Sequence, residues 1–202
     1  GDGGDDVFLG YERHRQMLAI SRAAGAVPPF AAGAWRAVRR FVPRAGLLRR
    51  LRHATDYVTG GLGAYLAAHD GLPGFARLGV LGDRLRDEVP ESRRVPESTK
   101  SARRLLTDYL AWDLRHQFVG EYLTKVDGAT THYGLEARAP FFDQFLWEYV
   151  SSLPYDTRLH GGALKAVLRE IARRRISPRV AAGRKRGFSV PAERWVRGPW
   201  LK

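Results

Sequence analysis

Carboxylates and glycines alternate over the first six residues, Gly1-Asp2-Gly3-Gly4-Asp5-Asp6, before an apolar stretch begins at Val7. Glycine lets the backbone approach a ligand closely and adopt positive φ. Asp5 and Asp6 fall in the first turn of a predicted helix, where carboxylates suit the positive end of the helix dipole. Such a loop can hold a divalent cation through hard oxygen ligands, with phosphate as the cation's other partner. The competing interpretation is a solvated acidic turn with a helix cap.

Positive charge gathers near the other end of the chain, in the loop that runs from Gly183 to Phe188. Its three adjacent cations, Arg184-Lys185-Arg186, lie between two glycines and suit a polyphosphate ligand. An ordinary solvated surface is the alternative for a charge run of this kind. The six histidines show no metal-ligand spacing, so the sequence predicts no histidine metal site.

A polar stretch from Thr124 to Asp143 separates two apolar helices and is dense in hydroxyl and charged groups. Asp143 is expected to cap the helix that follows it. Glu136 and Arg138 cannot both remain unpaired if they are buried beside Pro140, so a structural ion pair is the default expectation for them.

Helices must position these loops, and the apolar periodicity predicts where they lie. One helix is expected from Asp5 to about Ala24, and a short basic one from Ala34 to Val42. The strongest candidate is Ala102 to Leu123, because an apolar stripe recurs there near the helical period. Its members are Leu106, Tyr109, Leu110, Leu114, Phe118 and Tyr122. Asp113, within this helix, is expected to have a surface or capping role, with a functional role as the alternative.

Composition bounds the function classes. The net charge of +13 comes from 34 Lys and Arg against 21 Asp and Glu, but the arginines are dispersed and do not alternate with aromatic residues. This layout argues against nucleic-acid binding. Cysteine is absent, which excludes disulfides and thiolate sites within these residues and fits a cytoplasmic protein. No apolar run approaches the ~20 residues that a transmembrane helix needs, so no membrane partner is expected.

Four stretches, taken in order, resemble the synthetase domain of the glutamine-hydrolysing asparagine synthetases. Residues 1–11, GDGGDDVFLGY, resemble that family's S-G-E/D-G-x-D-E-L/V-F-x-G-Y segment. Residues 123–143 resemble its L-x-K-x-D segment that ends in E-A/V-R-x-P-F-L-D. Residues 161–170, GGALKAVLRE, resemble G-G-x-x-K-x-x-L-R-E, and residues 184–191, RKRGFSVP, resemble a K-x-G/Q-F-x-x-P turn. The resemblance covers nearly the whole chain and is weakest from Ala24 to Lys100.

This resemblance implies the mainly α-helical C-terminal part of an α/β ATP-pyrophosphatase domain, which is Rossmann-like and of the adenine nucleotide alpha hydrolase type. Residues 1–202 would be one portion of a single asparagine-synthase domain, cut at both ends. The chain starts with neither an initiator methionine nor a targeting signal, which fits that expectation. The family's pyrophosphate loop and N-terminal glutaminase domain would then lie upstream, and this portion alone would be inactive.

The implied reaction uses ATP and Mg²⁺. The side-chain carboxylate of aspartate attacks the α-phosphate of ATP, which gives β-aspartyl-AMP and Mg-pyrophosphate, and ammonia then displaces AMP to give asparagine. The implied partners are aspartate, glutamine-derived ammonia and the glutaminase domain of the same full-length chain. A homodimer is compatible with this arrangement.

The resemblance assigns roles residue by residue. Asp5 matches the magnesium-ligand aspartate, and Lys185 matches the lysine that stabilises charge on the phosphates in both half-reactions. Asp2 matches an acid, commonly glutamate, which would act as the base when the ammonia adduct loses its protons. The expected nucleotide- or substrate-binding positions are Gly1, Gly3, Gly4, Glu136, Arg138 and Lys165.

Three departures from the family pattern leave the substrate open. Gly128 stands where Arg or Lys is usual, Thr131 where Met is common, and Asp6 where Glu is usual. β-Lactam synthetases and lasso-peptide cyclases share the machinery and adenylate other carboxylates, and amidotransferases of polysaccharide clusters often carry the Asp form of the first loop. A non-catalytic basic module that binds nucleic acid is the alternative from another class, and it requires Asp2 and Asp5 to face bulk solvent.

Overall fold

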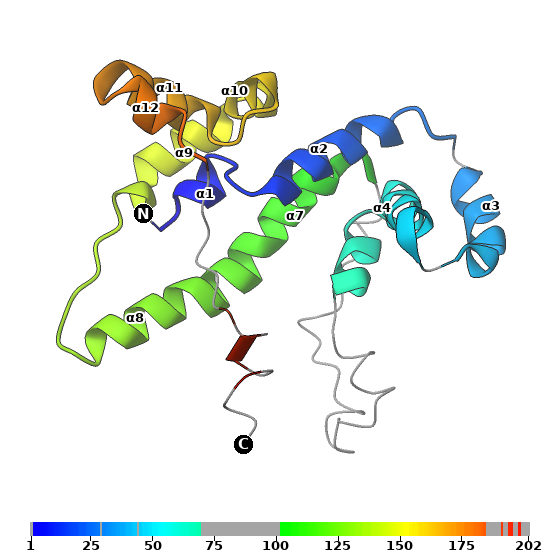
Figure 1. Cartoon of the computed structure of the whole chain (residues 1–202), viewed down its shortest axis with the longest axis horizontal. Helices are drawn as coiled ribbons and strands as arrows, with labels where there is room; N and C mark the ends of the chain where they lie inside the picture. Colours follow the sequence, from blue (N-terminus) through cyan, green and yellow to red (C-terminus); the bar gives the residue numbers. More distant parts are fainter. Residues whose placement is uncertain are drawn as a thin grey trace.

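The computed structural model (Figure 1) describes residues 2–28, 30–43, 45–69, 102–184, 191, 194, 195 and 198. This part of the chain is helical and contains no β-strand. The α-helices are α1 (Gly4–Val7), α2 (Glu12–Ala24), α3 (Ala31–Val38), α4 (Gly46–His69), α7 (Leu105–Asp113), α8 (Thr124–Thr131), α9 (Gln144–Ser152), α10 (Tyr155–Arg158), α11 (Ala166–Arg175) and α12 (Pro178–Ala181). Shorter or wider turns are η1 (Arg39–Phe41), η4 (Ala102–Arg104), η5 (Leu114–Leu123), η6 (Pro140–Phe142) and η7 (His160–Gly162).

The mainly helical character agrees with the sequence-based expectation. The parent α/β class stays a prediction, because the described residues contribute helices alone. The helix expected from Asp5 to Ala24 is interrupted. Leu9, at φ 57, breaks it into α1 and α2, and backbone of this hand is uncommon for a residue with a side chain.

One apolar cluster joins α2, α4 and α7. Met17 and Leu62 pack against Leu105, Leu106 and Tyr109, and all five side chains are buried. In Figure 1, α2 lies along α7, while α7, η5 and α8 follow one another as a long helical rod. This cluster therefore fixes the direction of the rod relative to the N-terminal helices.

The rod departs from regular α-helical geometry in η5, which is a π-helix. Tyr109 and Asp113 are buried four residues apart, but the next buried position is Phe118, five residues further on. Leu114, predicted to be in the core, is 40% exposed. The expected surface or capping role of Asp113 is also wrong, since this carboxylate is buried. A stripe counted at the α-helical period cannot register the extra residue in a π-turn.

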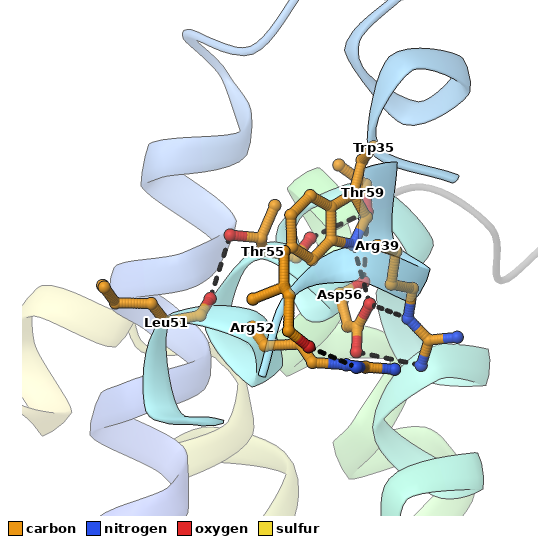
Figure 2. A network of polar contacts seen from close by, with 8 residues as sticks. Trp35, Arg39, Leu51, Arg52, Thr55, Asp56 and Thr59 are labelled. Atoms are coloured by element: carbon orange, nitrogen blue, oxygen red, sulfur yellow. Dashed lines mark hydrogen bonds and ion pairs between the residues drawn. The ribbon is translucent and has the colours of Figure 1, made fainter. Parts of the chain in front are cut away.

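A polar network joins α3 and η1 to α4 (Figure 2). The Asp56 carboxylate accepts hydrogen bonds from Trp35 Nε1 at 2.7 Å and from Arg39 Nε at 2.6 Å and Nη2 at 3.0 Å. Nearby, Arg52 donates to the carbonyl of Val42 at 3.0 Å. These contacts hold the short basic helix, predicted near residues 34–42, against α4.

A second apolar cluster positions the acidic turn near the N-terminus, which comprises Asp2 to Asp6. Val7 and Phe8, at the end of α1, pack with Val150 of α9. Partly buried residues complete the cluster from η6, α9 and α11: Phe141, Leu146, Trp147, Val167 and Leu168. Asp143 caps α9 as predicted, since its Oδ1 accepts from the Leu146 amide at 2.8 Å. The carbonyl of Val7 also accepts a hydrogen bond from buried Arg158 at 3.2 Å, so α1 is fixed from two sides.

Candidate functional site

Two glycines of the acidic turn, Gly3 and Gly4, pack closely against phenylalanines of η6. Gly3 precedes α1 with φ +82, and a Cβ placed there would lie 2.4 Å from a ring carbon of Phe142. A Cβ on Gly4 would lie 3.1 Å from Phe141. The sequence predicts that these glycines let a ligand approach, whereas the structure shows the η6 phenylalanines approaching them. The first and second family-like stretches are thereby brought into direct contact.

Asp5 forms an ion pair with a residue 160 positions away. Its Oδ1 lies 3.0 Å from Lys165 Nζ, and the two side chains are 27% and 28% exposed. Gly10 holds the carboxylate in place, because a Cβ at that position would lie 1.9 Å from Asp5 Oδ1. The Gly10 amide also donates to the Asp5 carbonyl at 2.6 Å. The contact joins the first family-like stretch to the one around residues 161–170.

Lys165 adopts a left-handed conformation, with φ 55 and ψ 39, immediately before α11. Left-handed backbone at a residue with a side chain costs roughly 1–2 kcal/mol and concentrates at functional sites. Gly161 and Gly162, at φ 61 and 75, bend the chain into this position. The lysine is thus held beside Asp5 by a local conformation that a simple helix start does not require.

Arg169, one helical turn after Lys165, is a residue that the sequence did not single out. Its side chain donates to the carbonyls of Leu164 at 2.9 Å, Ala181 at 2.6 Å and Gly183 at 3.0 Å. One guanidinium therefore joins the backbone just before Lys165 to the start of the predicted basic loop. A signal was present, because Arg169 lies in the matched L-R-E sequence.

Lys185 and Gly1 lie outside the described residues, and so do the other members of the loop from Lys185 to Val190. The predicted encounter between the acidic turn and Lys185 stays a prediction. The flanking described residues are consistent with it, since Asp5 contacts Lys165 and Arg169 links the same segment to Gly183.

Beside the acidic turn lies a polar group formed by the buried Tyr109 and Asp113 and the partly buried Asp6 and Arg13. Tyr109 donates its hydroxyl to Asp113 Oδ1 at 2.9 Å, and Arg13 stacks on the Tyr109 ring at 5.5 Å. Burial, together with the charges of Asp113 and Asp5, raises the pKa of Asp6 to about 6, although the Arg13 charge opposes this shift. Burial also raises the pKa of Asp113, although Tyr109 and Arg13 oppose that shift. Asp6 is thus directed into the protein, beside an Asp5 that remains partly accessible.

The remaining predicted residues lie on the surface. Glu136 and Arg138 pair with each other at 2.7 Å, as expected for an ion pair. Their side chains are 73% and 82% exposed, so this ion pair lies on the surface and is not buried beside Pro140. Asp2 is exposed in the turn that leads to Gly3.

Comparison with known proteins decides the family. The profile of a family described as Asparagine synthase matches residues 1–202. This chain belongs to the asparagine synthase family. The four family-like stretches are therefore parts of an asparagine synthase domain, and the first three of them meet in this chain through the contacts of Gly3, Gly4 and Asp5.

Curated relatives carry the same family name at low identity. The asparagine synthetase (glutamine-hydrolyzing) 1 of Bacillus subtilis is 31% identical over 42% of this chain, which is 13% of the relative. Provisionally named asparagine synthetases (glutamine-hydrolyzing) of Mycobacterium bovis and Mycobacterium tuberculosis are each 26% identical over 98% of this chain. The chain spans 30% of the length of these two relatives. No solved structure matches. In the described part of the chain, no helix is long and apolar enough to cross a membrane.

The asparagine synthase resemblance implies Mg²⁺ at Asp5, and the side chains there can be compared with what that ion needs. Mg²⁺ keeps several waters and is usually bound through one or two carboxylates together with substrate phosphates. Within the described ranges, no group of three or more His, Cys, Asp or Glu side chains is arranged to hold a metal. A single half-buried carboxylate at Asp5 fits an ion that arrives with its nucleotide.

Proposed function

We propose that this chain forms part of an ATP-dependent, AMP-forming ligase that activates aspartate as β-aspartyl-AMP and amidates it to asparagine. The supporting observation is the Asp5–Lys165 pair, which joins two asparagine synthase motifs across the fold at 3.0 Å. A carboxylate and a lysine held together at a partly accessible position suit the binding of a metal-bound polyphosphate. Because Asp5 is only 27% exposed, this geometry also disfavours a module whose acids face bulk solvent.

Three side chains would act on the phosphates. Asp5 would hold Mg²⁺, which when bound neutralises charge on the departing pyrophosphate. Lys165 would contact phosphate oxygens, and Lys185 would stabilise the negative charge that develops on the phosphates in both half-reactions. These cations favour pyrophosphate departure because its charge density is high. Gly1, Gly3 and Gly4 would allow the backbone to lie close to the nucleotide, for Gly3 and Gly4 on the side that Phe141 and Phe142 do not cover.

The amidation step needs a proton acceptor. Attack by ammonia on the activated carboxyl gives a cationic adduct, and a positioned carboxylate can remove its proton. Asp2 is proposed for this role because it is exposed in the turn beside Asp5. Glu136 and Arg138 are proposed to contact aspartate or the adenylate. Their mutual ion pair must then open or reorient, and its exposure makes that change inexpensive.

The remaining partners follow from the same proposal. Ammonia would come from glutamine, hydrolysed by an N-terminal glutaminase domain of the same full-length chain. We also propose a cytoplasmic enzyme and keep a homodimer as a compatible arrangement.

ATP–pyrophosphate exchange in the full-length protein tests the proposal. Exchange should depend on aspartate and should collapse in Asp5→Asn and in Lys185→Ala, with Arg49→Gln on α4 as a charge-removing control. Exchange that survives both substitutions would show that the roles are wrongly assigned. Exchange that depends on a different carboxylic acid would favour a β-lactam synthetase, lasso-peptide cyclase or polysaccharide-cluster amidotransferase type of substrate instead.

A further inference from the structure

Lys165 contacts one of the two carboxylate oxygens through which a metal could bind Asp5. Its Nζ lies 3.0 Å from Asp5 Oδ1, the distance of a charge-assisted hydrogen bond. A divalent cation bound to that oxygen and an ammonium group at the same oxygen would repel each other strongly. The two cations therefore compete for Asp5 unless one of them finds another anion.

The two partners differ in their freedom to move. Asp5 lies within α1 and is held by Gly10, whose backbone leaves no room for even a methyl group beside Oδ1. Lys165 reaches the carboxylate through a flexible four-carbon stem, and its side chain is 28% exposed. A change of partner would therefore move the lysine and leave the carboxylate in place.

The position of Lys165 also favours an anion beyond Asp5. It directly precedes α11, a helix of ten residues whose N-terminal end carries partial positive charge. A cation is unfavourable there unless an anion accompanies it, and Asp5 supplies that anion in the present structure. A phosphate brought in by the metal would serve both the ammonium group and the helix end.

We infer that Lys165 is an internal substitute for the metal, which neutralises Asp5 in the nucleotide-free protein and transfers to a phosphate oxygen when metal and polyphosphate bind. This inference rests on the proposed function and deepens it. Lys165 opposes the binding of metal alone and promotes the binding of metal with pyrophosphate. Its substitution therefore has opposite effects on the two affinities.

The test measures Mn²⁺ affinity by electron paramagnetic resonance on the full-length protein, first without and then with pyrophosphate. Lys165→Met should bind Mn²⁺ alone roughly fivefold to tenfold more tightly than the parent protein. In saturating Mn²⁺ it should bind pyrophosphate roughly tenfold more weakly. Lys165→Gly should behave in the same way although it relaxes the left-handed backbone, so a folding defect cannot account for both variants.

Controls separate the possible causes. Lys165→Arg should retain both parent affinities within about threefold, and Arg49→Met removes an equal charge from α4 and should change neither. Unchanged or weaker Mn²⁺ binding in both Lys165→Met and Lys165→Gly would overturn the inference. Mn²⁺ binding that survives Asp5→Asn would also overturn it, because the metal would then lie elsewhere. Absence of aspartate-dependent exchange in the parent protein would instead contradict the proposed function. It would not contradict the inference about Lys165, which is tested by the Mn²⁺ and pyrophosphate affinities.

Discussion

Two carboxylates in this molecule, Asp56 and Asp5, are paired with cations in different ways. Asp56 is buried, and it accepts three hydrogen bonds from Trp35 and Arg39, all within one stretch of sequence (Figure 2). Asp5 is partly exposed and paired with Lys165, which is distant in sequence and directly precedes α11. Arg39 holds Asp56 through two parallel N–H groups, whereas Lys165 offers a single ammonium group on a flexible stem.

The comparison separates structural pairing from exchangeable pairing. A buried carboxylate with three donors loses much when a donor leaves, since desolvated charge is then uncompensated. A partly exposed carboxylate with one mobile cation loses little, because water and another cation can replace the lysine. We therefore expect Asp56 to stabilise the fold and Asp5 to bind metal and phosphate. Four substitutions test this difference, and they follow in order of decreasing expected effect.

The largest effect on stability is expected at Asp56. Asp56→Ala should lower the free energy of unfolding by about 2 to 3 kcal/mol, because it leaves Trp35 Nε1 and the half-exposed Arg39 guanidinium without their acceptor. Denaturant unfolding of the full-length protein measures this. Double substitution with Arg39→Met should recover part of the loss, and the absence of any recovery would argue against a coupled network.

Gly10→Ala should have the second largest effect on stability, and it should also weaken Mn²⁺ binding. The new Cβ would lie 1.9 Å from Asp5 Oδ1, so the carboxylate or the turn has to shift. Overpacking of this kind costs roughly 1–3 kcal/mol. The variant should also lose Mn²⁺ affinity, whereas Gly33→Ala, where a Cβ meets nothing within 4 Å, should not. Full Mn²⁺ affinity in Gly10→Ala would show that Asp5 is less tightly held than the geometry indicates.

Asp113→Asn tests a third carboxylate through pH. Burial raises the folded-state pKa of Asp113 above its ordinary value of 3.8, so the folded protein loses stability as pH rises through that window. Asparagine keeps an acceptor for Tyr109 and does not ionise. The free energy of unfolding of the variant should therefore increase relative to that of the parent protein as pH rises above about 4. The increase should reach up to about 1.4 kcal/mol for each unit by which the pKa of Asp113 is raised. A constant stability difference between pH 4 and 7 would contradict this cause.

The smallest effect is expected for Asp5→Asn. Removing this partly exposed ion pair should change the free energy of unfolding by less than about 1 kcal/mol, although we expect it to abolish pyrophosphate exchange. Thermal unfolding of Asp5→Asn and of Asp56→Ala under the same conditions compares the two losses of stability. A loss as large as that of Asp56→Ala would remove the distinction between the two carboxylates.

The sequence indicated which stretches carry the candidate site better than it indicated the contacts and the local backbone that arrange them, and the Asp5–Lys165 pair was not predicted. The family-like stretches located Asp5 and Lys165, and residue type located the Asp143 cap. The break at Leu9 was not predicted, because its left-handed conformation is fixed by packing around a fully buried side chain. The burial of Asp113 was missed for a similar reason, since tertiary contacts and the π-turn override the α-helical period. Arg169 was missed because a motif names residues without showing which carbonyls they reach.

The wide turn η5 has a consequence for chain length. Each residue in an α-helix advances the rotation by about 100°, so deleting one residue between Leu114 and Leu123 would turn the segment after it by a similar angle unless η5 tightened into an α-helix and absorbed the change. That segment carries Phe141 and Phe142, which press on the glycines of the acidic turn. The number of residues in η5 therefore bears on where Phe141 and Phe142 lie against the glycines of the acidic turn.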